Sequence, residues 1–211
     1  AWGTKMRAVL AGLFWLIALN ASAQTELAPR LERIASEDGA IVGAHVFDTG
    51  SSSAARGAVV LLHGGGWVAG DATWMYPRAR RFAERGVLTV SVEYRLGNPR
   101  LATADARSVI RWLRDNADTL HIDPDRIATY GVSAGGQIAV STAQTEDARA
   151  RPNAIVLVSP ALDLERDGWF ARLAGEEAAR ELSPLSNVRA GLPPTIRSEE
   201  HTSELQSQNA I

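Results

Sequence analysis

Two glycine-rich motifs, each directly after a short apolar run, constrain the fold of this chain more than any other feature. Residues 63–67 read His-Gly-Gly-Gly-Trp and follow the run 58–62, and residues 131–136 read Gly-Val-Ser-Ala-Gly-Gly and follow the run 126–130. Short apolar runs are typical of buried parallel strands, and glycine permits backbone turns that a side chain would block. The sequence therefore predicts two strands that each end in a sharp turn.

The second motif has the form Gly-x-Ser-x-Gly, with Ser133 between Gly131 and Gly135. On a strand–turn–helix unit this form lifts the serine to the tip of the bend, where a base can reach its hydroxyl. The Ala-rich stretch 137–143 supplies the predicted helix. Ser133 is therefore a candidate nucleophile, and Gly131 and Gly135 are the residues that permit the turn.

Backbone N–H groups near Ser133 would complete such a site. An ester attacked by a serine develops negative charge on its carbonyl oxygen, and one preorganised donor stabilises that charge by roughly 2.7–4 kcal/mol. One donor comes from the residue after the nucleophile, Ala134, and the others come from the first loop. A lone Gly-x-Ser-x-Gly also occurs in ordinary turns, but the first motif, about 70 residues upstream, favours a catalytic site.

Over about residues 39–196 the chain resembles the α/β-hydrolase superfamily, in particular its hormone-sensitive-lipase-like and acetyl- or feruloyl-esterase-like branch. Two departures from that pattern leave the substrate class open. Val132 precedes the serine where many lipase-like members carry Asp, and residues 97–99, Gly-Asn-Pro, replace the usual Ala-Pro-Glu. Further segments fit the resemblance, namely Gly70-Asp71, Glu93-Tyr94-Arg95-Leu96, residues 122–127 and Ser159-Pro160.

The resemblance implies roles for individual residues of the two motifs. Gly65, Gly66 and Ala134 would be the donors to the oxyanion. His63, together with Gly64, would shape the first loop rather than act as the base.

A serine nucleophile needs a histidine to take its proton and a carboxylate to orient that histidine, and in this fold the order along the chain is Ser, acid, His. Three histidines precede Ser133, and His201 is the one histidine after it. A weak candidate for the acid is Asp163, which follows the apolar run 154–158. The alternative is that Asp163 satisfies a local turn after Pro160.

The C-terminal segment 197–211 differs in composition from the rest of the chain. It reads as the in-frame translation of a common sequencing adapter, so we interpret it as a non-native tail and the natural gene as interrupted after Ile196. The resemblance makes residues 192–196 the loop and first residues of the strand that precedes the triad acid. On this interpretation residues 24–196 are a partial domain whose C-terminal strands, triad acid and histidine are missing, and the chain is an inactive fragment. The alternative is an ordinary disordered polar tail.

The N-terminal segment 6–23 has the pattern of a secretory signal peptide. A short basic start is followed by an apolar stretch at 8–19 and by a small-residue cleavage site, Ala21-Ser22-Ala23. We therefore expect export, to the periplasm or out of the cell, and we interpret residues 1–5 as upstream read-through. The apolar stretch is shorter than the roughly 20 residues of a membrane-spanning helix, so we expect no stable membrane anchor. The alternative is an uncleaved anchor.

Composition excludes several kinds of chemistry. The 211 residues contain no cysteine, which excludes disulfides and thiol catalysis. The net charge is −2, and acidic and basic residues balance once residues 197–211 are set aside, so nothing indicates a nucleic-acid partner. The sequence has no metal-ligand spacing such as His-Glu-x-x-His. We therefore expect no metal, no organic cofactor and no nucleic acid.

Strand-like and helix-like segments alternate after the first strand. This order favours an α/β fold with a mostly parallel central sheet and helices on both faces, and it puts Ser133 at the carboxyl end of a strand. The segment 165–182, which includes Trp169, is either a small cap over an acyl pocket or simple packing. The expected strands are 41–47, 58–62, 88–93, 127–130 and 154–158, and the expected helices are 77–84, 103–116 and 135–145.

Taken with the resemblance, these motifs favour a serine carboxylic-ester hydrolase that forms an acyl-enzyme. Its substrate would be a small-molecule or carbohydrate-linked ester. Two alternatives remain: an exported peptidase or carbohydrate deacetylase on the same fold, or a non-catalytic hydrolase-like binding protein. Acyl preference, alcohol preference and oligomeric state are left open.

Overall fold

The computed structural model describes residues 26–50 and 55–199. The segments predicted to be a signal peptide and upstream read-through lie outside the described residues, as does the predicted tail beyond Glu199. Among the helices that the structure describes, none is long and apolar enough to cross a membrane.

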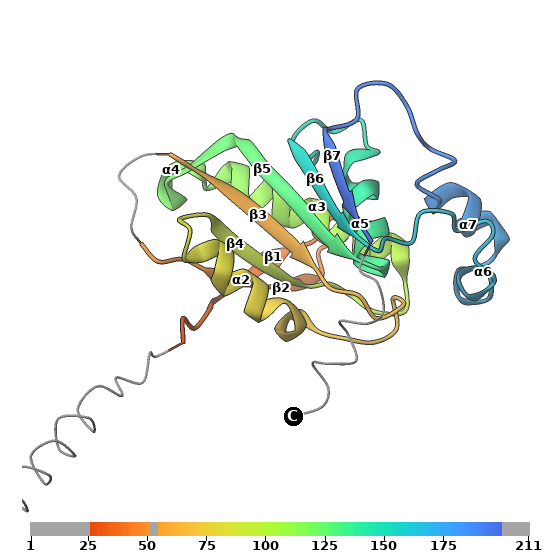
Figure 1. Cartoon of the computed structure of the whole chain (residues 1–211), viewed down its shortest axis with the longest axis horizontal. Helices are drawn as coiled ribbons and strands as arrows, with labels where there is room; N and C mark the ends of the chain where they lie inside the picture. Colours follow the sequence, from red (N-terminus) through yellow and green to blue (C-terminus); the bar gives the residue numbers. More distant parts are fainter. Residues whose placement is uncertain (1–25, 51–54, 200–211) are drawn as a thin grey trace, which may run out of the picture.

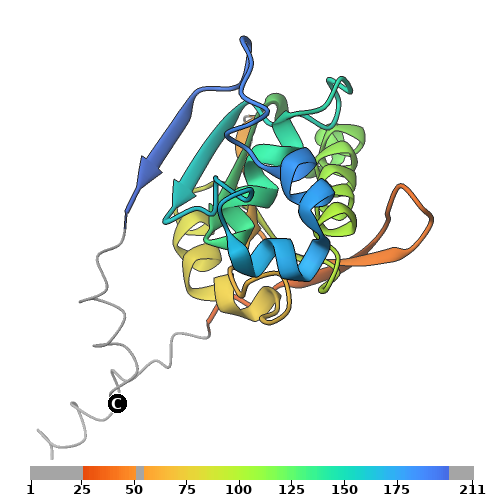
Figure 2. The ribbon, with the colours of Figure 1, turned by 90° about the vertical axis from the view of Figure 1, so that its right-hand side faces the viewer.

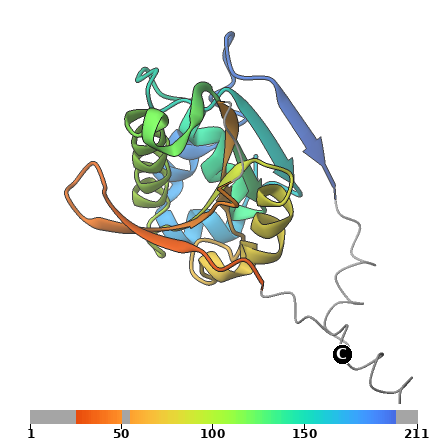
Figure 3. The same ribbon diagram turned by 90° about the vertical axis from the view of Figure 1, so that its left-hand side faces the viewer.

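Within the described residues, seven strands form one sheet in the order β1-β2-β4-β3-β5-β6-β7 (Figure 1). Neighbouring strands are parallel from β4 to β7, whereas β2 pairs antiparallel with both β1 and β4. Figure 3 shows the β1–β2 hairpin, in orange, running along one side of the molecule. The strands are β1 (Arg30–Ala35), β2 (Ile41–Phe47), β3 (Arg56–Leu62), β4 (Leu88–Glu93), β5 (Ile122–Val132), β6 (Ala154–Val158) and β7 (Thr195–Ser198).

Helices cover both faces of this sheet, as predicted, and each face has its own apolar core (Figure 1). Side chains alternate along β3, so that Val60 and Leu62 enter one core while Val59 and Leu61 enter the other. The first core includes residues of α3, α5 and the α6–α7 segment, and the second includes residues of α2. The helices are the 3₁₀ helix η1 (Ala72–Met75), α2 (Tyr76–Ala83), α3 (Pro99–Asp115), α4 (Ala117–Leu120), α5 (Ala134–Ala143), α6 (Gly168–Ala174) and α7 (Glu176–Leu182).

Three predicted strands have the bounds that the structure has: β2, β4 and β6. The other five predicted elements are present with different bounds, most of which are shifted by one or two residues. Helix α3 begins at Pro99 rather than at residue 103, because the Asn98 side chain accepts hydrogen bonds from the backbone N–H groups of Arg100 and Leu101 and so caps the helix there. Strand β5 begins at Ile122 rather than at residue 127, because its early part already pairs with the start of β3. Helix α5 ends at Ala143 rather than at 145.

Strand β1 has no counterpart among the predicted elements, and β7 was expected only through its first residues, 195–196. β1 carries one buried residue, Ile34, so its apolar pattern is too weak to mark a strand. β7 pairs in parallel with β6 and includes Arg197 and Ser198, which the sequence interpretation places in the tail. All four residues of β7 are exposed, and Figure 2 shows this strand, in blue, at the outer edge of the sheet.

Candidate active site

Ser133 lies at the tip of a sharp bend between β5 and α5. Its backbone has φ 52° and ψ −116°, a conformation that L-residues rarely adopt, and its side chain is exposed. The bend is held by the neighbouring strand: the Ser133 N–H donates to the Val158 carbonyl oxygen at 3.0 Å, and the Ala161 N–H donates to the Ser133 carbonyl oxygen at 3.1 Å. The predicted nucleophile therefore stands at the carboxyl edge of the sheet with its hydroxyl accessible.

Glycines make this bend possible. A Cβ atom on Gly131 would overlap the backbone of Gly135, and one on Gly135 would overlap the carbonyl oxygens of Leu62 and His63. Such contacts involve backbone atoms, which cannot move aside as a flexible side chain can. The two glycines that the sequence assigned to the turn are thus sterically required in it, and Gly135 also lets α5 approach the end of β3.

The first glycine motif lies beside Ser133. A Cβ atom on Gly64 would be 3.4 Å from the Ser133 Cβ atom, so this loop and the nucleophile bend are in contact. Gly65 and Gly66 have φ values of +117° and +60°, and a side chain on Gly65 would overlap the Ala69 carbonyl. Gly64, Gly65 and Gly66 therefore form a bare backbone loop next to the hydroxyl. Donation to an oxyanion by Gly65, Gly66 and Ala134 remains a prediction.

His63 is buried beneath this loop, and its contacts are those of a residue that shapes the loop rather than those of a base. Its Nδ1–H donates to the Gly64 carbonyl oxygen at 2.6 Å, and its ring stacks on Tyr94 with a centroid separation of 4.2 Å. Among the described residues, its buried Nε2 atom has no hydrogen-bond partner. Burial lowers the pKa of His63, although the hydrogen bond to Gly64 and the nearby carboxylates of Glu93 and Asp71 act in the opposite direction.

Tyr94 supports the same loop, although the sequence analysis assigned it no role. Its hydroxyl donates to the His63 carbonyl oxygen at 2.8 Å. Burial raises the pKa of Tyr94, so its phenol stays protonated and available as a donor. The position of Tyr94 directly after a predicted strand, at the same edge as the two motifs, is the signal that could have pointed to it.

No base for Ser133 is present in the part of the chain that the structure describes. Within residues 26–50 and 55–199, no side chain forms a hydrogen bond with the Ser133 hydroxyl. His45 on β2 is hydrogen-bonded to the Tyr76 hydroxyl at 2.6 Å, and His121 follows α4, at the start of β5 and so at the other end of that strand. His201 lies outside the described residues.

Asp163, the weak candidate for the acid, makes local contacts. Its carboxylate accepts a hydrogen bond from the Arg166 backbone N–H at 3.3 Å and lies 3.5 Å from the Arg166 Nε atom. These are the contacts expected of an aspartate that satisfies a turn after β6. A role of Asp163 as the acid has no further support from its neighbours and stays a prediction.

The predicted cap segment 165–182 folds into α6 and α7 and packs against the first loop (Figure 2). Trp67 is 2% exposed and lies edge-on to Phe170 of α6, with ring centroids 4.7 Å apart. Trp169 is 48% exposed and donates from its indole Nε1 to the Gly66 carbonyl oxygen at 3.4 Å. Trp67 is therefore a packing residue, whereas Trp169 reaches the loop beside Ser133.

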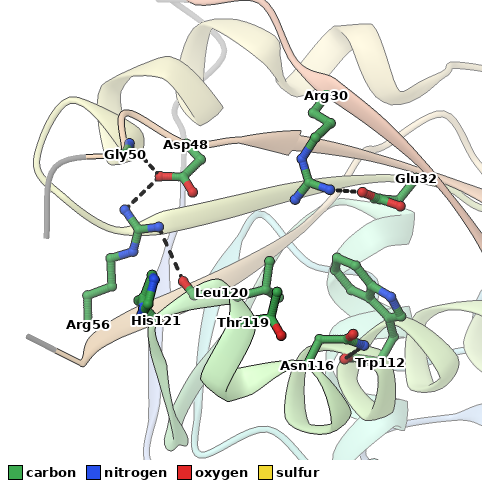
Figure 4. Close-up of a pocket in the computed structure, with 10 residues that line it drawn as sticks. All are labelled: Arg30, Glu32, Asp48, Gly50, Arg56, Trp112, Asn116, Thr119, Leu120 and His121. Atoms are coloured by element: carbon green, nitrogen blue, oxygen red, sulfur yellow. Dashed lines mark hydrogen bonds and ion pairs between the residues drawn. The ribbon is translucent and has the colours of Figure 1, made fainter. Parts of the chain in front are cut away.

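A cavity of about 310 Å³ lies at the opposite end of the sheet, where β3 and β5 begin (Figure 4). Its charged side chains pair with one another, Arg56 with Asp48 at 2.7 Å and Arg30 with Glu32. Because these charges neutralise each other, the cavity has no excess charge to attract an ionic ligand. Among the described residues, no cluster of three or more His, Cys, Asp or Glu side chains could hold a metal ion.

Comparisons with known proteins agree with this geometry. A family model described as alpha/beta hydrolase fold matches residues 59–195. An arylesterase of Saccharolobus solfataricus is 41% identical over 91 residues, which cover 41% of this chain and 30% of the relative. The carboxylesterase NlhH of Mycobacterium tuberculosis is 42% identical over 90 residues, covering 41% of this chain and 28% of the relative. The matched part of the chain thus spans about 30% of the length of these curated relatives.

A solved structure extends the likeness to most of the chain. The esterase Est2 of the planctomycete Thermogutta terrifontis, with propionate bound, has a TM-score of 0.72 and 29% sequence identity, and the match covers 83% of this chain and 72% of that one. The fold class expected from the motifs is thereby confirmed. Because the family model spans more than half of the sequence, the chain belongs to the α/β-hydrolase family.

Proposed function

We propose that this chain is part of a serine hydrolase that cleaves carboxylic esters, with Ser133 as the nucleophile. One observation carries the proposal: the exposed Ser133 hydroxyl stands at a positive-φ bend, in contact with a loop of bare glycine backbone. The arylesterase and carboxylesterase relatives and the solved esterase support it. Attack by Ser133 on the ester carbonyl forms an acyl-enzyme and releases the alcohol, and water then releases the acid.

Backbone groups stabilise the charge that develops in the first step. The Ala134 N–H belongs to the first turn of α5, whose leading N–H groups have no partner within the helix. The α5 dipole adds a partial positive charge at the same point. With donors from Gly65 and Gly66, the site binds an oxyanion through backbone alone, which requires no metal.

We propose that the chain itself lacks activity, because a serine without a general base reacts slowly. This part of the proposal is supported by the absence, within residues 26–50 and 55–199, of a histidine hydrogen-bonded to Ser133. The acid and the histidine would then be supplied by codons that follow Ile196 in the natural gene. Reading those codons in the source DNA tests this directly.

The proposed substrate is a small ester with a short acyl group. The protein would encounter it after export, which the predicted signal peptide at residues 6–23 would direct. The propionate in the solved esterase supports a short acyl group. An exported peptidase or carbohydrate deacetylase would use the same nucleophile, so substrate panels of aryl acetates, peptide anilides and acetylated sugars separate these activities. Preference for peptide or sugar substrates would replace the ester proposal.

A fluorophosphonate probe tests the nucleophile in the full-length protein. We expect covalent labelling of the native protein and none of Ser133→Ala. The matched control is Ser159→Ala, because Ser159 also has positive φ, at 41°, and follows the neighbouring strand β6. Labelling that persists in Ser133→Ala would reject Ser133 as the nucleophile, and absence of labelling in the native protein would favour a binding protein.

A further inference from the structure

Gln137 is a fully buried amide one turn after Ser133, and its side chain joins three parts of the site. Its Oε1 atom accepts a hydrogen bond from the Trp67 indole Nε1 at 2.9 Å. Its Nε2 atom donates to the Ser141 hydroxyl at 2.8 Å and to the Leu182 carbonyl oxygen at 3.4 Å. A primary amide offers two donors and one oxygen acceptor, so both ends of this side chain are engaged in an interior where it is 0% exposed.

The partners of Gln137 belong to elements that are far apart in the sequence. Trp67 is the last residue of the first glycine motif, 70 positions upstream. Leu182 is the last residue of α7, so its carbonyl oxygen is one of those that have no partner inside the helix. Ser141 lies on α5, one turn beyond Gln137 itself. The amide therefore connects the glycine loop, the helix that follows the nucleophile and the end of the cap segment.

Trp67 links the Gln137 amide to the glycine loop, because its indole bonds to Gln137 and its backbone directly follows Gly66. It has φ 65°, a strained value for a bulky residue, and its carbonyl oxygen accepts a hydrogen bond from the Gly97 N–H at 2.7 Å. Rotating the buried indole away would leave the Gln137 acceptor and the indole N–H unpaired, which is costly for groups shielded from solvent. The direction of the Gly66–Trp67 peptide is thus fixed relative to α5, which begins directly after Ser133.

We propose that Gln137 is a positioning residue that holds the loop containing Gly65 and Gly66 in a fixed geometry relative to Ser133. A second contact acts on the same loop from α6, where the Trp169 indole donates to the Gly66 carbonyl oxygen. Gln137 touches no reacting atom and acts only through Trp67. The catalytic meaning of this role rests on the proposed function, whereas the positional role itself concerns the described chain alone.

The test is an NMR comparison of the 211-residue chain with Gln137→Met, which keeps the length of the side chain and removes all its hydrogen bonds. The readouts are the Trp67 indole N–H, assigned with Trp67→Phe, and the amide signals of Gly65 and Gly66. We expect the indole proton to shift upfield and to exchange with solvent at least about tenfold faster, and both glycine amides to shift or broaden.

Thr142→Val is the matched control. Thr142 is as deeply buried on the same helix, but its hydroxyl bonds only to the Ala139 carbonyl oxygen and not to the loop. We expect this variant to lose stability while leaving the Trp67, Gly65 and Gly66 signals in place. Gln137→Glu at pH 5, where a buried carboxyl group is neutral, should restore the indole signal, because it again accepts from Trp67.

The outcomes separate the two proposals. Unchanged Trp67 and glycine signals in Gln137→Met would overturn the positioning role, as would equal changes in Thr142→Val. In the full-length protein, Gln137→Met should slow labelling of Ser133 by about 10- to 100-fold, since a displacement of about 1 Å costs that much. If Gln137→Met shifts the NMR signals but the fluorophosphonate probe never labels the native full-length protein, the positioning role is supported. The proposed function is then rejected.

Discussion

Strands β3 and β7 belong to the same sheet, yet their surroundings differ completely. Five consecutive residues of β3, Ala58 to Leu62, are buried, with an apolar core on each face. All four residues of β7 are exposed, and among the described strands β7 pairs with β6 alone. Backbone pairing places a strand in the sheet, but burial supplies most of the stabilisation. The strained bend at Ser133 lies where two buried strands end, because only dense packing can hold such a conformation.

The largest effect is expected where a glycine of the site meets backbone. Gly135→Ala would push a methyl group into the carbonyl oxygens of Leu62 and His63, and should cost more than about 4 kcal/mol. Gly191→Ala, near the exposed edge, meets no atom within 4 Å and has φ +83°, so it should cost about 1–2 kcal/mol. Urea unfolding of both variants measures these losses in the free energy of unfolding. Similar midpoints would contradict the steric account of the bend.

The second-largest effect is the loss of stability when a side chain of β3, rather than one of β7, is shortened to alanine. Leu61→Ala removes a fully buried side chain of β3 and should cost about 2–5 kcal/mol. Ile196→Ala removes a side chain of β7 that is 69% exposed, and should change stability by less than about 0.5 kcal/mol. Thermal and chemical unfolding report both values. A loss above about 1.5 kcal/mol at Ile196 would mean that β7 is covered in solution.

The smallest expected effect is the contribution of buried His63 to the pH dependence of stability. Burial holds the pKa of His63 below its ordinary value of 6.5, so the unfolded chain takes up a proton at pH values where the folded chain does not. The stability from keeping His63 neutral is therefore complete above pH 6.5 and is lost as the pH falls below it. Unfolding midpoints between pH 7.5 and 5.5 should fall in the native chain and fall less in His63→Gln. Parallel curves for the two would argue against a buried neutral imidazole.

Much of the fold could be predicted because local sequence decides it. Strand β6 is a continuous apolar run, and its bounds follow from the polar residues Asn153 and Ser159 on either side. The early start of α3 was also encoded locally, in the capping Asn98 and the following proline. β1 could not be predicted, because its hydrogen bonds come from a neighbouring strand while its side chains are largely exposed. The side chains of β7 are exposed as well, and its first residues were expected from the family resemblance alone.

The candidate site divides in the same way. Ser133, Gly131 and Gly135 could be placed from the motif, since the turn they form involves a few adjacent residues. The contacts of Tyr94 and Gln137 could not be placed, because each acts on a residue about 30 or 70 positions away, and such contacts exist only after the sheet has formed. For Tyr94 the sequence offered its position at the end of a predicted strand, and for Gln137 it offered no such signal. Short motifs thus identify the groups that carry the chemistry, whereas the groups that hold them in place emerge from the tertiary structure.

The backbone conformation of Ser133 has a consequence for how such a chain changes over time. Holding a serine at φ 52° uses about 1–3 kcal/mol of folding free energy, and glycine at that position would recover part of it. A change from serine to glycine would therefore remove the hydroxyl and relieve the strain in a single step. Stability and the proposed activity therefore oppose each other at this single residue.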